Sequence, residues 1–241
     1  MSRLRVVVCG LAVSLVWSVL PSVAQTTAAQ PAFAPVAPSE RIPNLDRLKQ
    51  ELKEYHECTC KCGCYAKDLD LQADRALAFL RQRAAHRAAH EKPALVLDID
   101  ETTLSNYPEM LKADFEYSGK AFAEWVDSAS AAAIPGTLRL YNEAQKLGVS
   151  VFFLTGRPDT QRAATERNLR GQGFAGWKEL IMRSPEQGSL TALEYKSAER
   201  EKIEGQGYRI VLNVGDQWSD LRGKPEAEYS VKYPDPYYFI K

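Results

Sequence analysis

The sequence predicts an α/β fold built on a parallel β-sheet. Short apolar runs recur at residues 94–97, 149–154 and 210–214, and each leads directly into a polar turn. Strands buried on both faces of a parallel sheet read as continuous apolar runs, and chemistry gathers outside their carboxyl ends. Strands are expected near residues 94–99, 149–154, 179–183 and 209–215, with 228–232 as a candidate fifth, and helices are expected between them.

The amino-terminal segment has the pattern of a targeting signal. Arg3 and Arg5 precede an apolar stretch from Val6 to Leu20, and the small residues that follow end at Ala24. This pattern predicts a secretory signal peptide at 1–24, cut after Ala24. A linker rich in Pro and Ala follows at 25–44 in place of a basic flank, so no stable membrane span is expected. The protein is therefore expected to be secreted or periplasmic.

Residues 45–92 are expected to form a helical region, with a helix from Asp68 to about His90 leading to the first strand. All four cysteines beyond the signal peptide gather here: Cys58, Cys60, Cys62 and Cys64. Two interpretations remain open. Disulfides, within or between chains, are easiest from Cys58 to Cys62 or Cys64 across a turn at Gly63, because neighbours two apart close a tight ring. The other interpretation is a soft-metal site for Zn²⁺ or Cu⁺ with His56 nearby.

The first apolar run delivers two carboxylates to its end, because Asp98-Ile-Asp-Glu-Thr102 follows it directly. Two carboxylates this close cannot both stay ionised without a cation or a shared proton, and a divalent metal explains the pair most simply. Side chains two apart on a strand point the same way, whereas a turn that begins at the second residue would swing it toward a substrate. Asp98 and Asp100 are therefore expected to have different roles. A helix cap or a plain loop is the alternative.

The other two strand ends also carry polar groups. Thr155 and Gly156 offer a hydroxyl and a backbone N–H suited to a phosphoryl oxygen, although an ordinary strand-to-helix turn would look the same. Asp216 and Asp220 lie four residues apart and would share one face of a first helical turn, aimed at one point. The alternative is a helix cap and a surface acid.

A fixed cation is predicted at Lys196. The segment from Thr191 to Glu194 is a capping box that begins a helix and places Lys196 in its first turns. The helix macrodipole disfavours a cation there, and a solvated surface lysine is the alternative. A pocket that holds four carboxylates and a phosphate nevertheless needs a fixed cation besides the metal.

In this order, these residues resemble the four motifs of the haloacid dehalogenase superfamily. The resemblance is closer to its secreted acid phosphatase family, which includes bacterial class B and class C enzymes and plant vegetative storage proteins, and it covers residues 93–241. It implies a haloacid dehalogenase-like, Rossmannoid parallel sheet with helices on both faces and a small helical cap. The segments that carry it are Asp98-Ile-Asp-Glu-Thr-Thr-Leu-Ser-Asn106, Phe153-Leu-Thr-Gly-Arg157, Glu194-Tyr-Lys-Ser-Ala-Glu-Arg200, Gly207-Tyr-Arg-Ile210, Asn213-Val-Gly-Asp-Gln-Trp-Ser-Asp220 and Pro234-Asp-Pro-Tyr-Tyr-Phe239.

The resemblance also implies roles for the site residues. Asp98 would attack phosphorus to form an aspartyl-phosphate, and Asp100 would protonate the leaving oxygen and then deprotonate water. Mg²⁺ would be held by the Asp98 carboxylate, the Asp100 carbonyl and Asp216. Asp220 would bind the ion through water or orient Lys196. The phosphoryl oxygens would be held by three groups: Thr155, the Gly156 amide and Lys196.

The segment at about 104–135 is too long for a simple crossover and is rich in aromatic residues, so it is interpreted as a cap over the site. Tyr107 and Trp125 are the candidates for stacking on an aromatic or nucleoside leaving group. The alternative is that the aromatic residues of this segment form the cap's own small core.

The net charge of the chain limits which classes of partner are expected. The chain has 31 basic and 31 acidic residues, and loss of residues 1–24, whose only charged groups are Arg3 and Arg5, would leave 29 against 31 and a net charge of about −2. No nucleic-acid polymer is therefore expected as a partner. The resemblance implies a small-molecule phosphomonoester as the substrate, and a homo-oligomer is left open.

The function that the resemblance implies is an exported, Mg²⁺-dependent acid phosphatase. A narrow-specificity nucleotidase or phosphotransferase of the same fold is one alternative. A metal-binding or storage-type protein with vestigial activity is the other.

Overall fold

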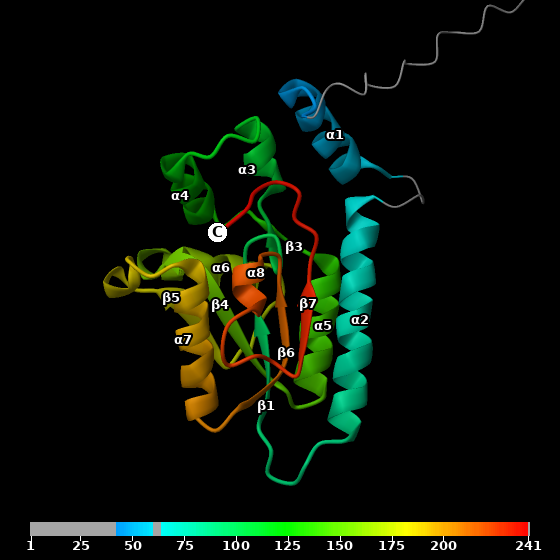
Figure 1. Ribbon diagram of the computed structural model, residues 1–241, viewed down its shortest axis with the longest axis vertical. Coiled ribbons are helices and arrows are strands. Elements are labelled where there is room, and N and C mark those ends of the chain that lie inside the picture. Colours follow the sequence, from blue (N-terminus) through cyan, green and yellow to red (C-terminus); the bar gives the residue numbers. More distant parts are fainter. Residues whose placement is uncertain (1–41, 60–63, 241) are drawn as a thin grey trace, which may run out of the picture. The chain divides into compact units, whose positions relative to one another are not determined.

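A computed structural model describes residues 42–59 and 64–240. Its centre is a five-stranded sheet in the order β5-β4-β1-β6-β7, and every neighbouring pair is parallel (Figure 1). The strands are β1 (Pro93–Leu97), β4 (Ser150–Pro158), β5 (Glu179–Arg183), β6 (Arg209–Gly215) and β7 (Tyr229–Lys232). The predicted parallel sheet is confirmed, including its fifth strand. Two strand ends differ by two or more residues. Strand β1 ends at Leu97 and not at the expected 99, and β4 continues through Thr155 and Gly156, which were expected to form a turn.

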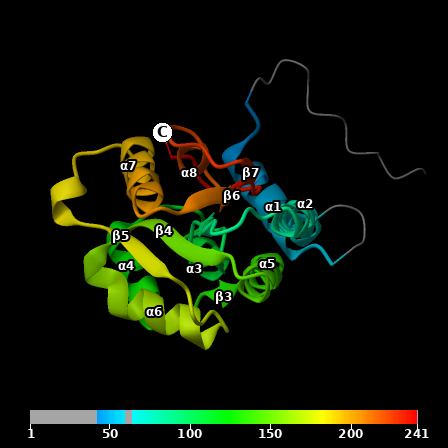
Figure 2. The same cartoon turned by 90° about the horizontal axis from the view of Figure 1, so that it is seen from below.

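Helices cover both faces of the sheet, as predicted (Figure 2). Along β1, Leu95 and Leu97 join one buried cluster, whereas Ala94 and Val96 join another. This alternation follows from the two-residue repeat of a strand. The first cluster packs against α2 (Tyr65–Ala85), α5 (Pro135–Lys146) and α6 (Arg162–Gly171), and the second packs against α7 (Ala192–Gly205).

Helix α2 ends five residues before the predicted His90. The chain must turn back toward β1 at this point, and His90 itself has a left-handed backbone with φ 66°. The Arg87 guanidinium braces the turn by donating to the Glu91 carbonyl at 2.6 Å and 3.0 Å. A residue in this conformation cannot continue a right-handed helix.

A small insertion follows β1 and lies within the predicted cap segment. It begins and ends in a two-stranded antiparallel ribbon of β2 (Leu104–Ser105) and β3 (Ala132–Ala133). Between them lie α3 (Tyr107–Lys112) and α4 (Gly119–Ser128). The Ser118 side chain caps α4 by accepting from the Ala121 N–H, and Ala129 ends it with φ 52°.

The remaining helices are α1 (Leu45–Glu57), the four-residue α8 (Trp218–Leu221) and two short 3₁₀ turns, Asp159–Gln161 and Pro185–Gln187. Among residues 42–59 and 64–240, none of the helices is both long and apolar enough to cross a bilayer. The predicted signal peptide and nearly all of the predicted linker lie outside the described residues, as do Cys60 and Cys62. Cys58 is half-buried and Cys64 is buried. The two interpretations of the cysteine cluster stay predictions.

Candidate active site

A tight turn at the end of β1 separates the two motif carboxylates. The Asp98 N–H still donates to the Val214 carbonyl at 3.0 Å, so this residue continues the parallel ladder. The chain then folds around the Ile99 carbonyl, which accepts from the backbone N–H groups of the residues at 102, 103 and 104 at 2.8–3.3 Å. Glu101 takes a positive φ of 53° to make this turn. As a result, Asp98 and Asp100 meet different partners.

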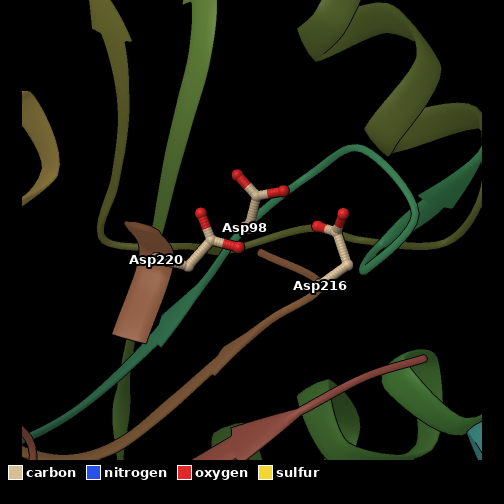
Figure 3. A group of neighbouring side chains, drawn as sticks. All are labelled: Asp98, Asp216 and Asp220. Carbon is tan, nitrogen blue, oxygen red and sulfur yellow. The ribbon is translucent and has the colours of Figure 1, made fainter. Parts of the chain in front are cut away.

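Three carboxylates converge just beyond the sheet. Asp98 comes from the end of β1, Asp216 follows β6 and Asp220 lies on α8 (Figure 3). One oxygen from each lies within 4.8 Å of the others, and all three residues are buried. Mg²⁺ takes oxygen ligands at 2.0–2.1 Å, which places opposite ligands about 4.2 Å apart. The donor set and its spacing therefore fit a hard divalent cation.

Local hydrogen bonds bring these carboxylates together. Asp220 accepts from the Gln217 backbone N–H at 2.8 Å, and Asp216 accepts from the Thr102 hydroxyl at 3.0 Å. A methyl group at Gly215 would overlap the Asp220 side chain, so only glycine permits this approach. The prediction that Asp216 and Asp220 share a helical turn was wrong, because α8 begins at Trp218 and Asp216 precedes it. They converge through the turn that Asp220 caps.

Lys196 reaches the same point from α7. Its ammonium donates to Asp98 Oδ1 at 2.5 Å and contacts Asp220 Oδ1, and the residue is only 6% exposed. The helix begins as predicted, with Thr191 and Glu194 forming a reciprocal capping box. Burial acts to lower the pKa of Lys196, but Asp220 and Asp98 outweigh it and raise the pKa above its ordinary value. Lys196 is therefore a fixed, charged group.

The cluster carries more negative charge than its surroundings can easily hold. Burial raises the pKa of Asp98 to about 7; Lys196 opposes this rise, and Asp220 and Asp100 add to it. Burial, with Asp220 and Asp98, also raises the pKa of Asp216 well above its ordinary value. Such shifts indicate a site that favours a proton or a cation between the carboxylates.

Asp100 has a different environment. Its carboxylate accepts from Arg157 Nη2 at 2.6 Å and from Arg157 Nε at 3.1 Å, and from Asn106 Nδ2 at 2.8 Å. Burial acts to raise the pKa of Asp100, but the Arg157 guanidinium outweighs it and the pKa is lowered. The environments of the two carboxylates therefore shift their pKa values in opposite directions: the pKa of Asp98 is raised and that of Asp100 is lowered.

Arg157 and Asn106 were absent from the predicted site set. Arg157 is 3% exposed, and the Asn106 amide also donates to Glu101 at 2.8 Å. Trp125 completes this network, because its indole N–H donates to Asn106 Oδ1 at 2.9 Å. The signal was present, since Arg157 and Asn106 are the last residues of two motif segments and each brings donors to a region rich in carboxylates.

Two of the three predicted phosphate-binding residues line the cavity beside the carboxylates, and the third does not. Gly156 and Lys196 both line a cavity of about 740 Å³ that also holds the three converging carboxylates. Thr155 is fully buried and does not line it. Its hydroxyl accepts from the Arg157 N–H at 3.1 Å, and its carbonyl accepts from the Tyr195 hydroxyl at 3.1 Å. A methyl group at Gly156 would meet nothing within 4 Å, so open space lies beside this glycine.

The aromatic residues chosen from the sequence do not line this cavity. Tyr107 stacks on His56 with ring centroids 3.4 Å apart and donates to Glu57 at 2.9 Å. Trp125 packs against the main core. Other aromatic residues line the cavity instead: Phe115, Tyr117 and Phe122 from the cap, and Tyr237, Tyr238 and Phe239 from the carboxyl-terminal segment.

The sequence of the chain is similar to those of known proteins. The family model for the HAD superfamily, subfamily IIIB (acid phosphatase), matches residues 19–241. Over 162 residues the chain is 41% identical to the Stem 31 kDa glycoprotein of Glycine max, covering 66% of this chain and 64% of the relative. Over 185 residues it is 38% identical to Acid phosphatase 1 of Solanum lycopersicum, covering 75% and 66%. The chain thus spans about two thirds of these relatives.

The fold also has a solved counterpart. The class C acid phosphatase of Bacillus anthracis superposes with a TM-score of 0.65 over 81% of this chain and 86% of that one, at 22% sequence identity. This likeness shows the fold, and the family model extends across nearly the whole sequence. The resemblance seen in the motifs is confirmed: the chain belongs to the subfamily IIIB acid phosphatases of the HAD superfamily.

Proposed function

We propose that this protein is an exported, Mg²⁺-dependent acid phosphatase that hydrolyses small phosphomonoesters through an aspartyl-phosphate on Asp98. The observation that carries the proposal is the position of the Asp98 carboxylate, which meets Lys196 at 2.5 Å and lies beside two further carboxylates on a cavity large enough for a small ester. Membership of an acid phosphatase subfamily supports the same chemistry.

Asp98 and Asp216, with the Asp100 carbonyl, would hold Mg²⁺, and Asp220 would stay with Lys196. When bound, the ion would neutralise the carboxylates and draw charge from the phosphoryl oxygens. Lys196 and the Gly156 amide would hold those oxygens where the transition state carries its charge.

In the first step, an Asp98 oxygen attacks phosphorus, so that the Asp98 O–P bond forms and the bond from phosphorus to the leaving oxygen breaks. In the second step, water attacks phosphorus, the Asp98 O–P bond breaks and inorganic phosphate leaves. Each step replaces one phosphorus–oxygen bond by another, so one hard displacement becomes two easier ones.

Asp100 would move the protons. Arg157 favours the ionised carboxylate, which is the form that accepts a proton from the attacking water. The first step needs the protonated form, which donates its proton to the leaving oxygen. A lowered pKa therefore makes the first step depend on an acidic medium.

Hydrolysis of p-nitrophenyl phosphate between pH 4 and 8, with Mg²⁺ or with EDTA, tests the proposal. Asp98→Asn should abolish turnover, whereas Asp127→Asn, at an exposed position outside the cavity lining, should keep it. Acid quenching with ³²P-labelled substrate should trap label on the wild type and on Asp127→Asn, but not on Asp98→Asn. Absence of hydrolysis by the wild type under every condition would refute the proposal and favour the storage-type alternative.

Two further measurements refine the reaction and its location. Addition of alcohol acceptors separates hydrolysis from phosphotransfer, because only a transferase forms the new ester in preference to phosphate. Export is supported by the sequence of residues 1–24 and by relatives named glycoproteins. The mass of the protein recovered from cells tests it, with loss of these residues expected.

A further inference from the structure

The carboxyl-terminal segment Tyr233–Ile240, called the strap here, forms part of the cavity wall. It leaves the end of β7 and runs toward the cap (Figure 1). The Tyr233 N–H donates to the Gly215 carbonyl at 2.9 Å, and the tyrosine is fully buried. Pro234 and Pro236 flank Asp235, and their fixed φ angles limit the freedom of this stretch.

The strap brings apolar side chains to the candidate active site. Its residues 237–240 line the same cavity as Asp98 and Lys196. Tyr237 stacks on Phe115 of the cap, with ring centroids 6.1 Å apart and an interplanar angle of 11°. Strap and cap therefore meet beside the place where a leaving group would lie.

Gln217 ties the strap to the carboxylate cluster. Its side-chain amide donates to Asp216 Oδ2 at 2.7 Å, to Asp235 Oδ2 at 2.6 Å and, more weakly, to the Tyr238 carbonyl at 3.4 Å. Its carbonyl oxygen accepts from the Ile240 N–H at 3.1 Å. The residue is 4% exposed, so these bonds form out of water.

An amide suits this place for a physical reason. Two carboxylates face its nitrogen, and an acidic side chain there would add a third negative charge. One group must also donate to the carboxylates and accept from the strap backbone, which a lysine or arginine cannot do. Gln217 thus links a candidate metal ligand, Asp216, to the strap through one side chain.

We propose that Gln217 is a positioning residue, which orients Asp216 for the cation and seats the strap, and that the strap in turn selects esters with an apolar or aromatic leaving group. This inference rests on the proposed function and adds to it the source of its specificity. Partners that orient metal ligands typically alter metal affinity 10–100-fold when removed.

Two variants and a control test it. Gln217→Met keeps the length of the side chain, removes all the hydrogen bonds that the side chain makes, and leaves the backbone N–H of residue 217 to donate to Asp220. A chain that ends at Pro236 removes the apolar wall and leaves Gln217 with both carboxylates. Gln187→Met is the matched control, because Gln187 also bonds through its amide, to Glu199 at 2.6 Å, but does not line the cavity. Circular dichroism establishes that each variant is folded.

Mg²⁺ affinity is measured by calorimetry without substrate, and specificity is measured as the ratio of kcat/KM for 2-phenylethyl phosphate to that for ethyl phosphate. Both leaving groups are primary alcohols, so the ratio reports binding. Gln217→Met should weaken Mg²⁺ binding about 10- to 100-fold and lower the ratio. The truncated chain should lower the ratio roughly 10-fold and leave Mg²⁺ affinity within about 3-fold. The control should change neither.

Unchanged Mg²⁺ affinity in Gln217→Met, or an unchanged ratio in the truncated chain, would overturn the inference. The proposed function fails separately, by absence of turnover in the wild type with either ester. In that event the calorimetric titration still decides the role of Gln217.

Discussion

Replacing Asp98 by asparagine should change how the stability of the metal-free protein depends on pH. Burial raises the pKa of this carboxyl group from its ordinary 3.8 to about 7. A carboxyl group with a higher pKa in the folded chain than in the unfolded chain stabilises the fold fully below the unfolded pKa. That stabilisation is lost as the pH rises through the folded pKa. Asparagine cannot ionise, so the variant lacks this loss.

The size of the effect follows from the two pKa values. A difference of about 3 in pKa corresponds to about 4 kcal/mol, and about 3 kcal/mol of it falls between pH 4 and pH 7. Over that interval, wild type should therefore lose about 3 kcal/mol of unfolding free energy relative to Asp98→Asn. Asp98 also helps to raise the pKa of Asp216, so the difference between the two proteins reports Asp98 together with its effect on this neighbour.

Urea denaturation in EDTA at several pH values between 4 and 7 measures this difference, with Asp127→Asn as the control for an exposed aspartate. At pH 7, Mg²⁺ should restore stability to the wild type and much less to Asp98→Asn, because only the wild type gains a partner for an ionised Asp98. Equal pH dependence of wild type and Asp98→Asn would refute the reasoning. It would mean that Lys196 alone compensates the buried charge.

Three further predictions concern the surrounding groups. Lys196→Met should cost about 3–5 kcal/mol of unfolding free energy at neutral pH, since it leaves buried carboxylates without their cation, and urea denaturation checks this. Gly215→Ala should weaken Mg²⁺ binding, because the methyl group displaces a cluster carboxylate, whereas Gly171→Ala, which has open space, should not; calorimetry compares them. Arg157→Met should raise the pKa of Asp100, so the fall in kcat at high pH should move to higher pH, as a pH–rate profile will show.

The sheet and the meeting of the motif residues could be predicted from the sequence. Continuous apolar runs mark strands buried on both faces, and the carboxyl ends of parallel strands lie on one edge. Residues from β1, β6 and α8 that are far apart in the chain therefore had to converge. The capping box at Thr191 likewise begins α7 where the sequence placed it.

The partners of individual side chains could not be predicted in the same way. Phe122 and Trp125 lie on one short helix, yet Phe122 lines the cavity while Trp125 packs on the core and bonds to Asn106. Composition does not say which face of a cap helix turns inward. Tyr107 was equally ambiguous, because its stacking partner, His56, comes from α1 about fifty residues earlier.

The charges of the site fit a divalent cation. The groups concerned are the carboxylates of Asp98, Asp100, Asp216 and Asp220 and the cations Lys196 and Arg157. Four negative charges against two positive ones leave a net charge of −2 when all are ionised. Without a metal, the raised pKa values of Asp98 and Asp216 relieve this excess by favouring protons. One Mg²⁺ would balance it, release those protons and leave Asp98 ionised, which is the state a nucleophile requires.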